Sequence, residues 1–181
     1  MSSLRIDLLN SAEKLELEAI LLEMSRRKIR SSFREYCVHA LAPLGHAPAP
    51  HHDLIIRELE AVAAGRTPRL MLNLPPGSAK STYASVLFPA WCLSQRKHLK
   101  IIAASNTAKL AERFSRSVLD QVRENGDVLG FSVDRGGVEM WDTTNGGAYR
   151  SAGVGGTITG FRCDLALVDD PVKSRAEAES E

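Results

Sequence analysis

The residues of this 181-residue chain that are best placed to do chemistry are Lys80 and Ser81. They end a short glycine-containing loop that leads from an apolar run into a helical stretch. Amide N–H groups at a helix start are unpaired, and the helix dipole adds positive potential, so a triphosphate fits there. Lys80 would reach the β- and γ-phosphates, and the Ser81 hydroxyl would bind Mg²⁺. The predicted nucleotide-binding residues are Pro76, Gly77, Ser78, Ala79, Lys80, Ser81 and Thr82.

This loop departs from the usual phosphate-loop pattern G-x-x-x-x-G-K-[ST]. Counting back from Lys80, Leu74 and Ala79 stand at the two glycine positions. A Cβ at residue 79 narrows the backbone conformations open to the loop, although it does not forbid phosphate binding. On this pattern alone, an incidental loop is as good an interpretation as a phosphate-binding one.

A second acidic element strengthens the phosphate-loop interpretation. The apolar run 164–170 ends in Asp169 and Asp170, about ninety residues after Lys80. In phosphate-loop enzymes the first such carboxylate holds Mg²⁺, and the next orients or deprotonates the attacking water. A pair of helix-capping aspartates before Pro171 is the alternative. We predict that Lys80 and Asp170 are catalytic and that Ser81 and Asp169 are the metal ligands.

The elements that must position these residues have an alternating pattern. Apolar runs at 70–74, 100–105 and 164–170 predict buried strands. Helices are expected at about 80–93, where Pro89 should kink or divide the helix, and from a cap at Asn106 or Thr107 to about Arg123. Segments 138–144 and 147–153 predict a hairpin. This alternation favours an α/β fold in which helices flank a parallel sheet.

The N-terminal region has a different pattern. Steps of three and four predict one or two helices, capped at Asn10 or Ser11, that pack on the main domain or dock a partner subunit. The apolar positions are Leu8, Ala12, Leu15, Ala19, Leu22, Ile29, Phe33, Tyr36 and Ala40. A proline-rich linker at 43–52 and a helix from about Asp53 to Ala64 follow. We therefore expect a helical segment over 1–46 and a second domain over 47–181.

Composition excludes several classes of protein. With 23 Lys and Arg against 22 Asp and Glu, the net charge of +1 excludes a basic nucleic-acid coat protein. A content of 44% hydrophobic residues is that of a globular protein. No apolar run approaches the roughly 20 residues of a membrane span, and the first ten residues lack a secretory signal pattern. Cys37, Cys92 and Cys163 lack metal-ligand spacing, which predicts reduced buried thiols in a cytosolic protein.

Four segments, in their order and spacing, resemble the large terminase subunit of tailed bacteriophages, the ATPase that drives DNA into the procapsid. They are HH (51–52), LMLNLPPGSAKST (70–82), IIAASNTAKLAERFS (101–115) and GVGGTITGFRCDLALVDDPVK (153–173). The resemblance covers about residues 47–175. It implies a P-loop NTPase domain of the ASCE type, with a parallel sheet flanked by helices, followed by an RNase H-like nuclease domain.

The resemblance also implies a function and partners. ATP and Mg²⁺ would be the cofactors, and hydrolysis would drive translocation of double-stranded DNA. Expected partners are the portal protein, the small terminase subunit and other copies of this chain in the assembled motor. The protein would be encoded by a virus or prophage and act in the cytoplasm of the bacterial host.

Individual roles follow from the same resemblance. Lys80 and Ser81 become the Walker A lysine and Mg²⁺ ligand, Asp169 becomes the Walker B carboxylate, and Asp170 stands where many relatives place a catalytic glutamate. Many terminases carry an arginine in the phosphate loop, and positions 75–79 hold none. Arg150 and Arg162 are therefore candidates for a transition-state arginine. His51 and His52 lie where relatives contact adenine, or form a surface pair.

Two further features bear on DNA. Residues 96–123 hold seven basic and two acidic residues, a local +5 that would meet DNA phosphates, with Arg113 and Arg116 as candidate contacts, or form a solvated helix face. Six of the thirteen glycines lie within 146–160, as a loop that approaches nucleotide or DNA, or as a turn without a ligand.

Two rival functions remain at this stage. One is another DNA-dependent P-loop ATPase, such as a helicase or repair translocase, and the other is a non-catalytic interaction fragment. Eleven residues follow Asp170, too few for the further strands that such an ATPase needs. We expect a fragment of a longer protein that by itself binds nucleotide weakly, hydrolyses it negligibly and tends to associate, with a strand at 164–170 that lacks a neighbour on one side.

Overall fold

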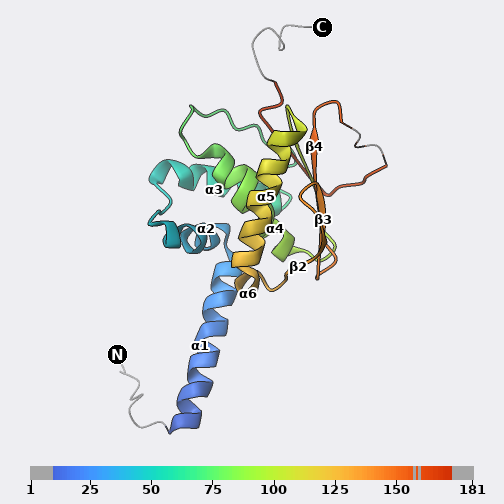
Figure 1. Ribbon diagram of the computed structural model, residues 1–181. Coiled ribbons are helices and arrows are strands. Elements are labelled where there is room, and N and C mark those ends of the chain that lie inside the picture. The colour runs from blue at the N-terminus through green and yellow to red at the C-terminus, as the bar shows by residue number, and fades with distance from the viewer. Residues whose placement is uncertain (1–9, 157, 159, 173–181) are drawn as a thin grey trace.

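The chain folds around one open, five-stranded sheet in a mixed α/β architecture (Figure 1). The structure is a computed structural model that describes residues 10–156, 158 and 160–172. The strand order is β2-β3-β4-β1-β5. The bounds are Lys100–Ser105 (β1), Val133–Gly136 (β2), Met140–Thr143 (β3), Ala148–Gly153 (β4) and Leu165–Asp169 (β5). Helices lie beside one face of this sheet (Figure 1).

The sheet is parallel only in part. Strand β1 pairs in parallel with β4 on one side and with β5 on the other. Strands β2, β3 and β4 pair in antiparallel fashion because a turn at Asn145–Gly147 joins β3 directly to β4. The predicted strands at 100–105 and 164–170 and the predicted hairpin are confirmed. The expected parallel pairing is found between β1 and its two neighbours only, and β2 was not predicted.

The strand predicted at 70–74 is not formed. Leu70, Leu72 and Leu74 pack against the core, and Met71 is 82% exposed, so the side chains alternate as they would in a strand. Within the described part of the chain, however, residues 68–74 make no backbone hydrogen bond to another segment. Strand β5 ends the sheet order, as expected of an unpaired edge. The apolar run is thus half-buried without a partner strand beside it.

The helical stretch after the predicted phosphate loop begins at Lys80, and its helix type changes just before Pro89. Residues Thr82–Leu87 form a π-helix (η3), and Phe88–Gln95 continue as α4. The Phe88 amide bonds to the Tyr83 carbonyl, five residues back, and Pro89 stands in the first turn of α4. Because proline lacks an N–H, the change in hydrogen-bond pattern falls at this point. The sequence predicts that Pro89 kinks or divides the helix, and the structure shows a change from π-helix to α-helix at Phe88, one residue before it.

Helix α5 (Ala108–Glu124) covers the face of the sheet that carries Trp141 and Tyr149. Thr107 caps it by accepting the Leu110 amide at 3.2 Å, as the sequence predicts, and the four-residue helix α6 (Gly126–Leu129) follows. Trp141 and Tyr149 stack with ring centroids 5.1 Å apart, and the Trp141 indole donates to the buried Ser115 hydroxyl at 3.1 Å. These contacts fix β3 and β4 against α5.

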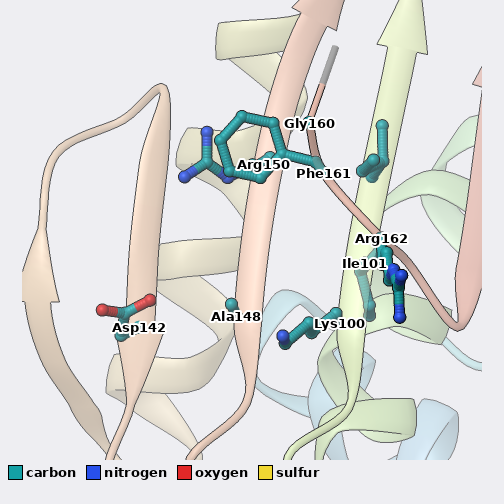
Figure 2. Close-up of a pocket in the computed structure, with 9 residues that line it drawn as sticks. Lys100, Ile101, Asp142, Ala148, Arg150, Gly160, Phe161 and Arg162 are labelled. Atoms are coloured by element: carbon teal, nitrogen blue, oxygen red, sulfur yellow. The ribbon is translucent and has the colours of Figure 1, made fainter. Parts of the chain in front are cut away.

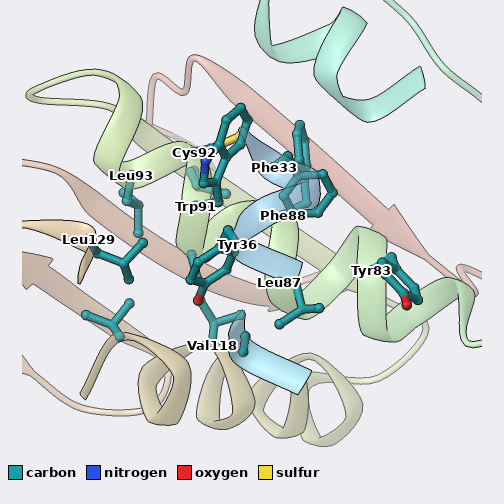
Figure 3. Packing of buried hydrophobic residues seen from close by; sticks show 14 of the residues in the cluster. Phe33, Tyr36, Tyr83, Leu87, Phe88, Trp91, Cys92, Leu93, Val118 and Leu129 are labelled. Atoms are coloured by element: carbon teal, nitrogen blue, oxygen red, sulfur yellow. The ribbon is translucent and has the colours of Figure 1, made fainter. Parts of the chain in front are cut away.

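The N-terminal helices differ in how they pack. Helix α1 (Ser11–Ser31) is capped by Asn10 and projects away from the sheet, so Leu15 and Leu22 are exposed (Figure 1). Packing of this stretch on the main domain was therefore a wrong expectation for Leu15 and Leu22. Helix α2 (Phe33–Leu41) does pack, since the Phe33 ring lies 5.4 Å from that of Phe88 and 5.3 Å from that of Trp91. Figure 3 shows this aromatic cluster.

Helix α3 (Pro50–Ala63) begins three residues earlier than predicted. Pro50 stands in its first turn, where a missing N–H costs nothing, and the His52 side chain caps the Ala49 amide. A short 3₁₀ turn, η2 (Ala42–Leu44), precedes it and ends at Gly45, whose φ of 72° is left-handed. No helix among the described residues is long and apolar enough to cross a membrane.

The three cysteines are free thiols in two different environments. Cys37 and Cys92 are buried as predicted, and burial raises the pKa of both thiols. Cys163 is exposed, which corrects the expectation that all three are buried. It precedes β5 in the segment that leads onto the edge strand.

Candidate nucleotide-binding site

The structure brings the loop lysine and the acidic pair together. Lys80 Nζ lies 3.5 Å from Asp169 Oδ1 and 3.3 Å from Asp170 Oδ1, although 90 residues separate Lys80 from Asp170. Lys80 is the first helical residue after the loop, and Asp169 is the last residue of β5. Two elements predicted separately from the sequence therefore meet at one end of the sheet.

The Asp169 carboxylate is buried and held at both oxygens. Asp169 is only 7% exposed. The Ser85 hydroxyl donates a hydrogen bond to its Oδ2 at 2.7 Å, and its Oδ1 faces Lys80. Sequence reasoning missed Ser85. The one available signal was its spacing, since Ser85 follows Ser81 by four residues and so lies on the same helix face.

The charge of Lys80 is balanced by the two aspartates. Burial lowers the pKa of Lys80, but the hydrogen bond with Asp170 and the charges of Asp169 and Asp170 outweigh that effect and raise it. The ammonium group is therefore protonated at neutral pH. An incoming phosphate would take the place of one or both carboxylates as its counter-charge.

Backbone conformations that are rare for non-glycine residues gather at this site. Ala79 has a φ of 56° and Asp170 a φ of 45°, and Gly77 in the same loop has a φ of 81°. The Cβ of Ala79 therefore does not stop the loop from taking a left-handed turn just before Lys80. Such strain clusters at functional sites, and aspartate tolerates this region better than most residues.

Oxygen donors suited to Mg²⁺ lie beside the loop. Ser81 is half-buried at the start of the helix, and Asp169 and Asp170 supply carboxylates. Among the residues that the structure describes, no three His, Cys, Asp or Glu side chains form a metal-binding cluster. Mg²⁺ in nucleotide sites commonly takes one or two carboxylates and completes its shell with phosphate and water oxygens, so this donor set fits.

His52 connects helix α3 to the loop. Its Nδ1 accepts the Ala49 amide at 3.0 Å and lies 3.2 Å from the Tyr83 hydroxyl, while its ring lies 4.5 Å from the Tyr83 ring. Burial and the neighbouring His51 lower the pKa of His52, against the opposing effects of the Ser78 backbone and Asp53. His52 thus supports the loop, and adenine contact by the histidine pair stays a prediction.

A long groove runs from this site along the edge of β5 that pairs with no other described strand. Its volume is about 1140 Å³, and Lys80, Ser85 and Asp169 line it together with Leu70, Leu72 and Leu167. The groove separates the unpaired segment 70–73 from the edge strand. The candidate site is therefore open to solvent through the same gap that leaves these two segments unpaired.

The candidate arginines do not lie in this groove. Arg150 and Arg162 line a different pocket of about 410 Å³ that shares no lining residue with the groove. Arg150 is half-way along β4 and pairs in register with Ile102, whereas β1 reaches the acidic end of the sheet at Ser105. The structure thus does not bring either arginine to Lys80.

The basic stretch 96–123 is divided between two sides of the sheet. Arg113 and Arg116 are exposed on helix α5, while Lys100 lines the pocket on the other face. Two further cations have partners, since Arg96 pairs with Asp164 and Arg123 with Asp120. The expected local charge of +5 is therefore not gathered on one surface. Lys100 lies on the face of the sheet opposite helix α5, which carries Arg113 and Arg116.

The glycine-rich segment is closely packed at several positions, and Gly153 is the clearest case because its neighbour is the backbone of helix α5. A Cβ added to Gly153 would lie 2.5 Å from the Ala108 backbone nitrogen, so the end of β4 touches the start of α5 too closely for any side chain. Gly155 has open space around it and a φ of 82°. Of the residues 146–160, Thr157 and Thr159 lie outside the described part of the chain.

Comparison with known proteins adds no relative. No family model matches the chain, and neither a curated protein nor a solved structure matches it significantly.

Proposed function

We propose that this chain is the ATPase region of a DNA-packaging motor of the terminase large-subunit kind, built on a P-loop NTPase fold. The observation that carries the proposal is the meeting of Lys80 with Asp169 and Asp170 within 3.5 Å. A lysine at a loop-to-helix junction and a carboxylate pair at a strand end are the minimum that phosphoryl transfer from ATP requires. Their separation by 90 residues argues against a local ion pair.

Each residue then has a role in binding or in hydrolysis. The loop 76–82 would bind the phosphates through backbone N–H groups, and Lys80 would neutralise the β- and γ-phosphate oxygens. Ser81 and Asp169 would hold Mg²⁺, which when bound offsets the charge that develops on the phosphates. Ser85 fixes Asp169 in place. The Asp170 side chain is 65% exposed, which suits a group that orients or deprotonates an attacking water.

Coupling to double-stranded DNA is the second part of the proposal. Arg113 and Arg116 are exposed on α5 and offer charge to a DNA backbone. The portal protein and the small terminase subunit would be the partners, with the motor acting in the cytoplasm of a bacterial host. Charge reversal at both arginines should weaken DNA binding and flatten its salt dependence. An unchanged salt dependence would mean that Arg113 and Arg116 lie on a solvated helix face without contacting DNA.

One observation favours a second function alongside the first. Helix α1 projects with Leu15, Ile20, Leu21, Leu22 and Met24 half or more exposed. An exposed apolar helix of this kind suits docking to a partner subunit, as in the interaction-fragment alternative. Partner capture that persists without nucleotide binding would select that alternative.

Titration with a fluorescent ATP analogue tests the nucleotide assignment. We expect binding to the chain to require Mg²⁺, and Asp169→Asn to abolish the Mg²⁺ dependence because it removes a charge at the metal. Asp120→Asn, an exposed carboxylate on α5, is the matched control and should bind as the unchanged chain does. Binding that is equally strong with Mg²⁺ and with EDTA would contradict the proposal.

A further inference from the structure

Three basic side chains line one pocket on the face of the sheet opposite helix α5. They are Lys100 at the start of β1, Arg150 in β4 and Arg162 in the segment that leads to β5 (Figure 2). The pocket has a volume of about 410 Å³ and is separate from the groove that holds Lys80. Nothing in the proposed ATPase chemistry uses it.

The strand register places two of these cations side by side. Lys100 is in register with Ala148, and Ile102 with Arg150, so Lys100 and Arg150 are diagonal neighbours on one face. Their Cα atoms lie roughly 8 Å apart, from a strand spacing of about 4.8 Å and a rise of about 3.3 Å per residue. Lysine and arginine side chains are long enough to span that separation and contact one anion between them. Tyr149 alternates to the opposite face, under α5.

The third cation arrives on a segment that crosses the sheet. Residues 160–162 run from β4 across β1, so that Phe161 lies over Arg150 and Arg162 lies beside β1 at the pocket (Figure 2). The Arg150 guanidinium carbon lies 3.0 Å above the centre of the Phe161 ring. Stacking of this kind fixes the guanidinium plane while leaving its edge N–H groups free to donate. Arg150 is thus held ready for a bidentate acceptor.

The positive charge in this pocket is not balanced by neighbouring carboxylates. Within the described residues, Lys100, Arg150 and Arg162 form no ion pair. Asp142 lines the pocket, but its Oδ2 accepts from Arg135 at 3.0 Å. Asp164 accepts the Lys100 amide N–H at 2.9 Å, and its side chain is paired with Arg96. Three cations therefore line one cavity, with their charged groups spread around it (Figure 2), and the nearby acids have other partners.

We propose that this pocket is a second anion site that binds a phosphate group independently of the nucleotide loop. Two guanidinium groups supply forked donors that match phosphate oxygens, and Lys100 adds a point charge. The cavity, with a volume of about 410 Å³, has room for a phosphate or diphosphate group. That group belongs either to a nucleic-acid backbone that lies along the open sheet face or to a small phosphorylated ligand.

The test measures both ligand sources in a chain whose loop lysine is replaced, Lys80→Gln, so that the loop site contributes little. Calorimetry reports the affinity for inorganic pyrophosphate, and fluorescence anisotropy reports that for a 20-base-pair DNA duplex. We expect Arg150→Gln with Arg162→Gln to weaken at least one ligand roughly tenfold or more, because two charge-assisted donors are lost. Arg57→Gln, an exposed cation on α3, is the matched control and should change neither affinity.

The pattern of loss identifies the ligand source. Weakening of pyrophosphate binding alone supports a small phosphorylated ligand, and weakening of duplex binding alone, with a shallower salt dependence, supports a nucleic-acid backbone. Unchanged affinity for both ligands, or no binding of either, overturns the proposal. If circular dichroism shows that the double variant is unfolded, Phe161→Leu replaces it in the test. This substitution removes only the ring under Arg150 and should weaken binding. Unchanged binding by a folded Phe161→Leu chain overturns the proposed site.

Discussion

Ser85 and Asp169, both buried, are joined by a hydrogen bond of 2.7 Å from the serine hydroxyl to the carboxylate oxygen Oδ2. The other carboxylate oxygen, Oδ1, faces Lys80 at 3.5 Å. One carboxylate is thus fixed by the helix that follows the loop at two points, Lys80 and Ser85. A group that must hold a metal in a defined position needs such support, since loose ligands bind weakly.

Replacement of Ser85 by alanine tests that support. Ser85→Ala leaves a buried carboxylate oxygen without its donor, so we expect a loss of about 2 kcal/mol in the free energy of unfolding. Mg²⁺-dependent nucleotide affinity should fall as well, because Asp169 is no longer fixed. Chemical denaturation and nucleotide titration measure the two effects. Ser117→Ala, a half-buried serine on α5 whose hydroxyl donates to the Arg113 carbonyl, is the control and should change stability by less than about 0.5 kcal/mol. If the Ser85→Ala chain kept both its stability and its nucleotide affinity, the hydrogen bond from Ser85 to Asp169 would have no role in either.

The two aspartates should separate by role. Asp170→Asn keeps a residue that tolerates the left-handed φ of 45° and removes only the charge. Nucleotide binding should be spared, and turnover should fall roughly 100-fold or more, as expected when the group that positions water is lost. Turnover is measured in this chain and, where the gene extends beyond Glu181, in the longer protein. Normal hydrolysis by Asp170→Asn would place the base elsewhere.

Ala79 offers a test of backbone strain at the loop. Its φ of 56° is costly for a residue with a Cβ, so Ala79→Gly should raise the free energy of unfolding by up to about 1 kcal/mol after the entropy of the unfolded glycine is counted. Ala84→Gly, in the helix that follows, should instead lower it by about 1 kcal/mol. Thermal or urea unfolding of the two variants decides. Destabilisation by both would mean that the loop does not hold residue 79 in the left-handed region.

His52 predicts a pH dependence with a definite sign. Its Nδ1 accepts the Ala49 amide, so protonation would set two donors against each other, and its folded pKa lies below the unfolded value of about 6.5. The folded state then binds fewer protons than the unfolded state, so its contribution to stability is present above about pH 6.5 and is lost as pH falls through the lowered pKa. His52→Asn keeps an acceptor near the Nδ1 position and should remove this part of the pH dependence. The test measures the free energy of unfolding at pH 7.5 and 5.0 in the unchanged chain and in His52→Asn. An equal difference between the two pH values in both chains would contradict this role of His52.

Sequence patterns predicted that Lys80 and the two aspartates lie close together, but they predicted less well how the surrounding segments pair and pack. Lys80 and Asp169 could be placed together because each follows an apolar run, although only the run before Asp169 forms a strand of the sheet. The apolar run 70–74 predicted correctly that its leucines are partly buried, but it predicted strand pairing wrongly. An apolar sequence indicates burial, whereas pairing also requires a neighbouring strand. Ser85 had no signal stronger than its spacing from Ser81. The exposure of α1 depends on where the helix points, which no periodicity records.

Calorimetric titration of ATP–Mg²⁺ into the chain and into Lys80→Ala tests the central claim most directly. The account predicts a measurable affinity for the chain and a loss of at least roughly tenfold for Lys80→Ala, because a charge-assisted contact to phosphate disappears. Lys109→Ala, an exposed lysine in the first turn of α5, serves as the matched control and should bind as the unchanged chain does. Lys80→Gln, which keeps a donor for Asp169, separates loss of charge from loss of fold. Equal affinity of the chain, Lys80→Ala and Lys80→Gln for ATP–Mg²⁺ would contradict the assignment of this loop as a nucleotide site.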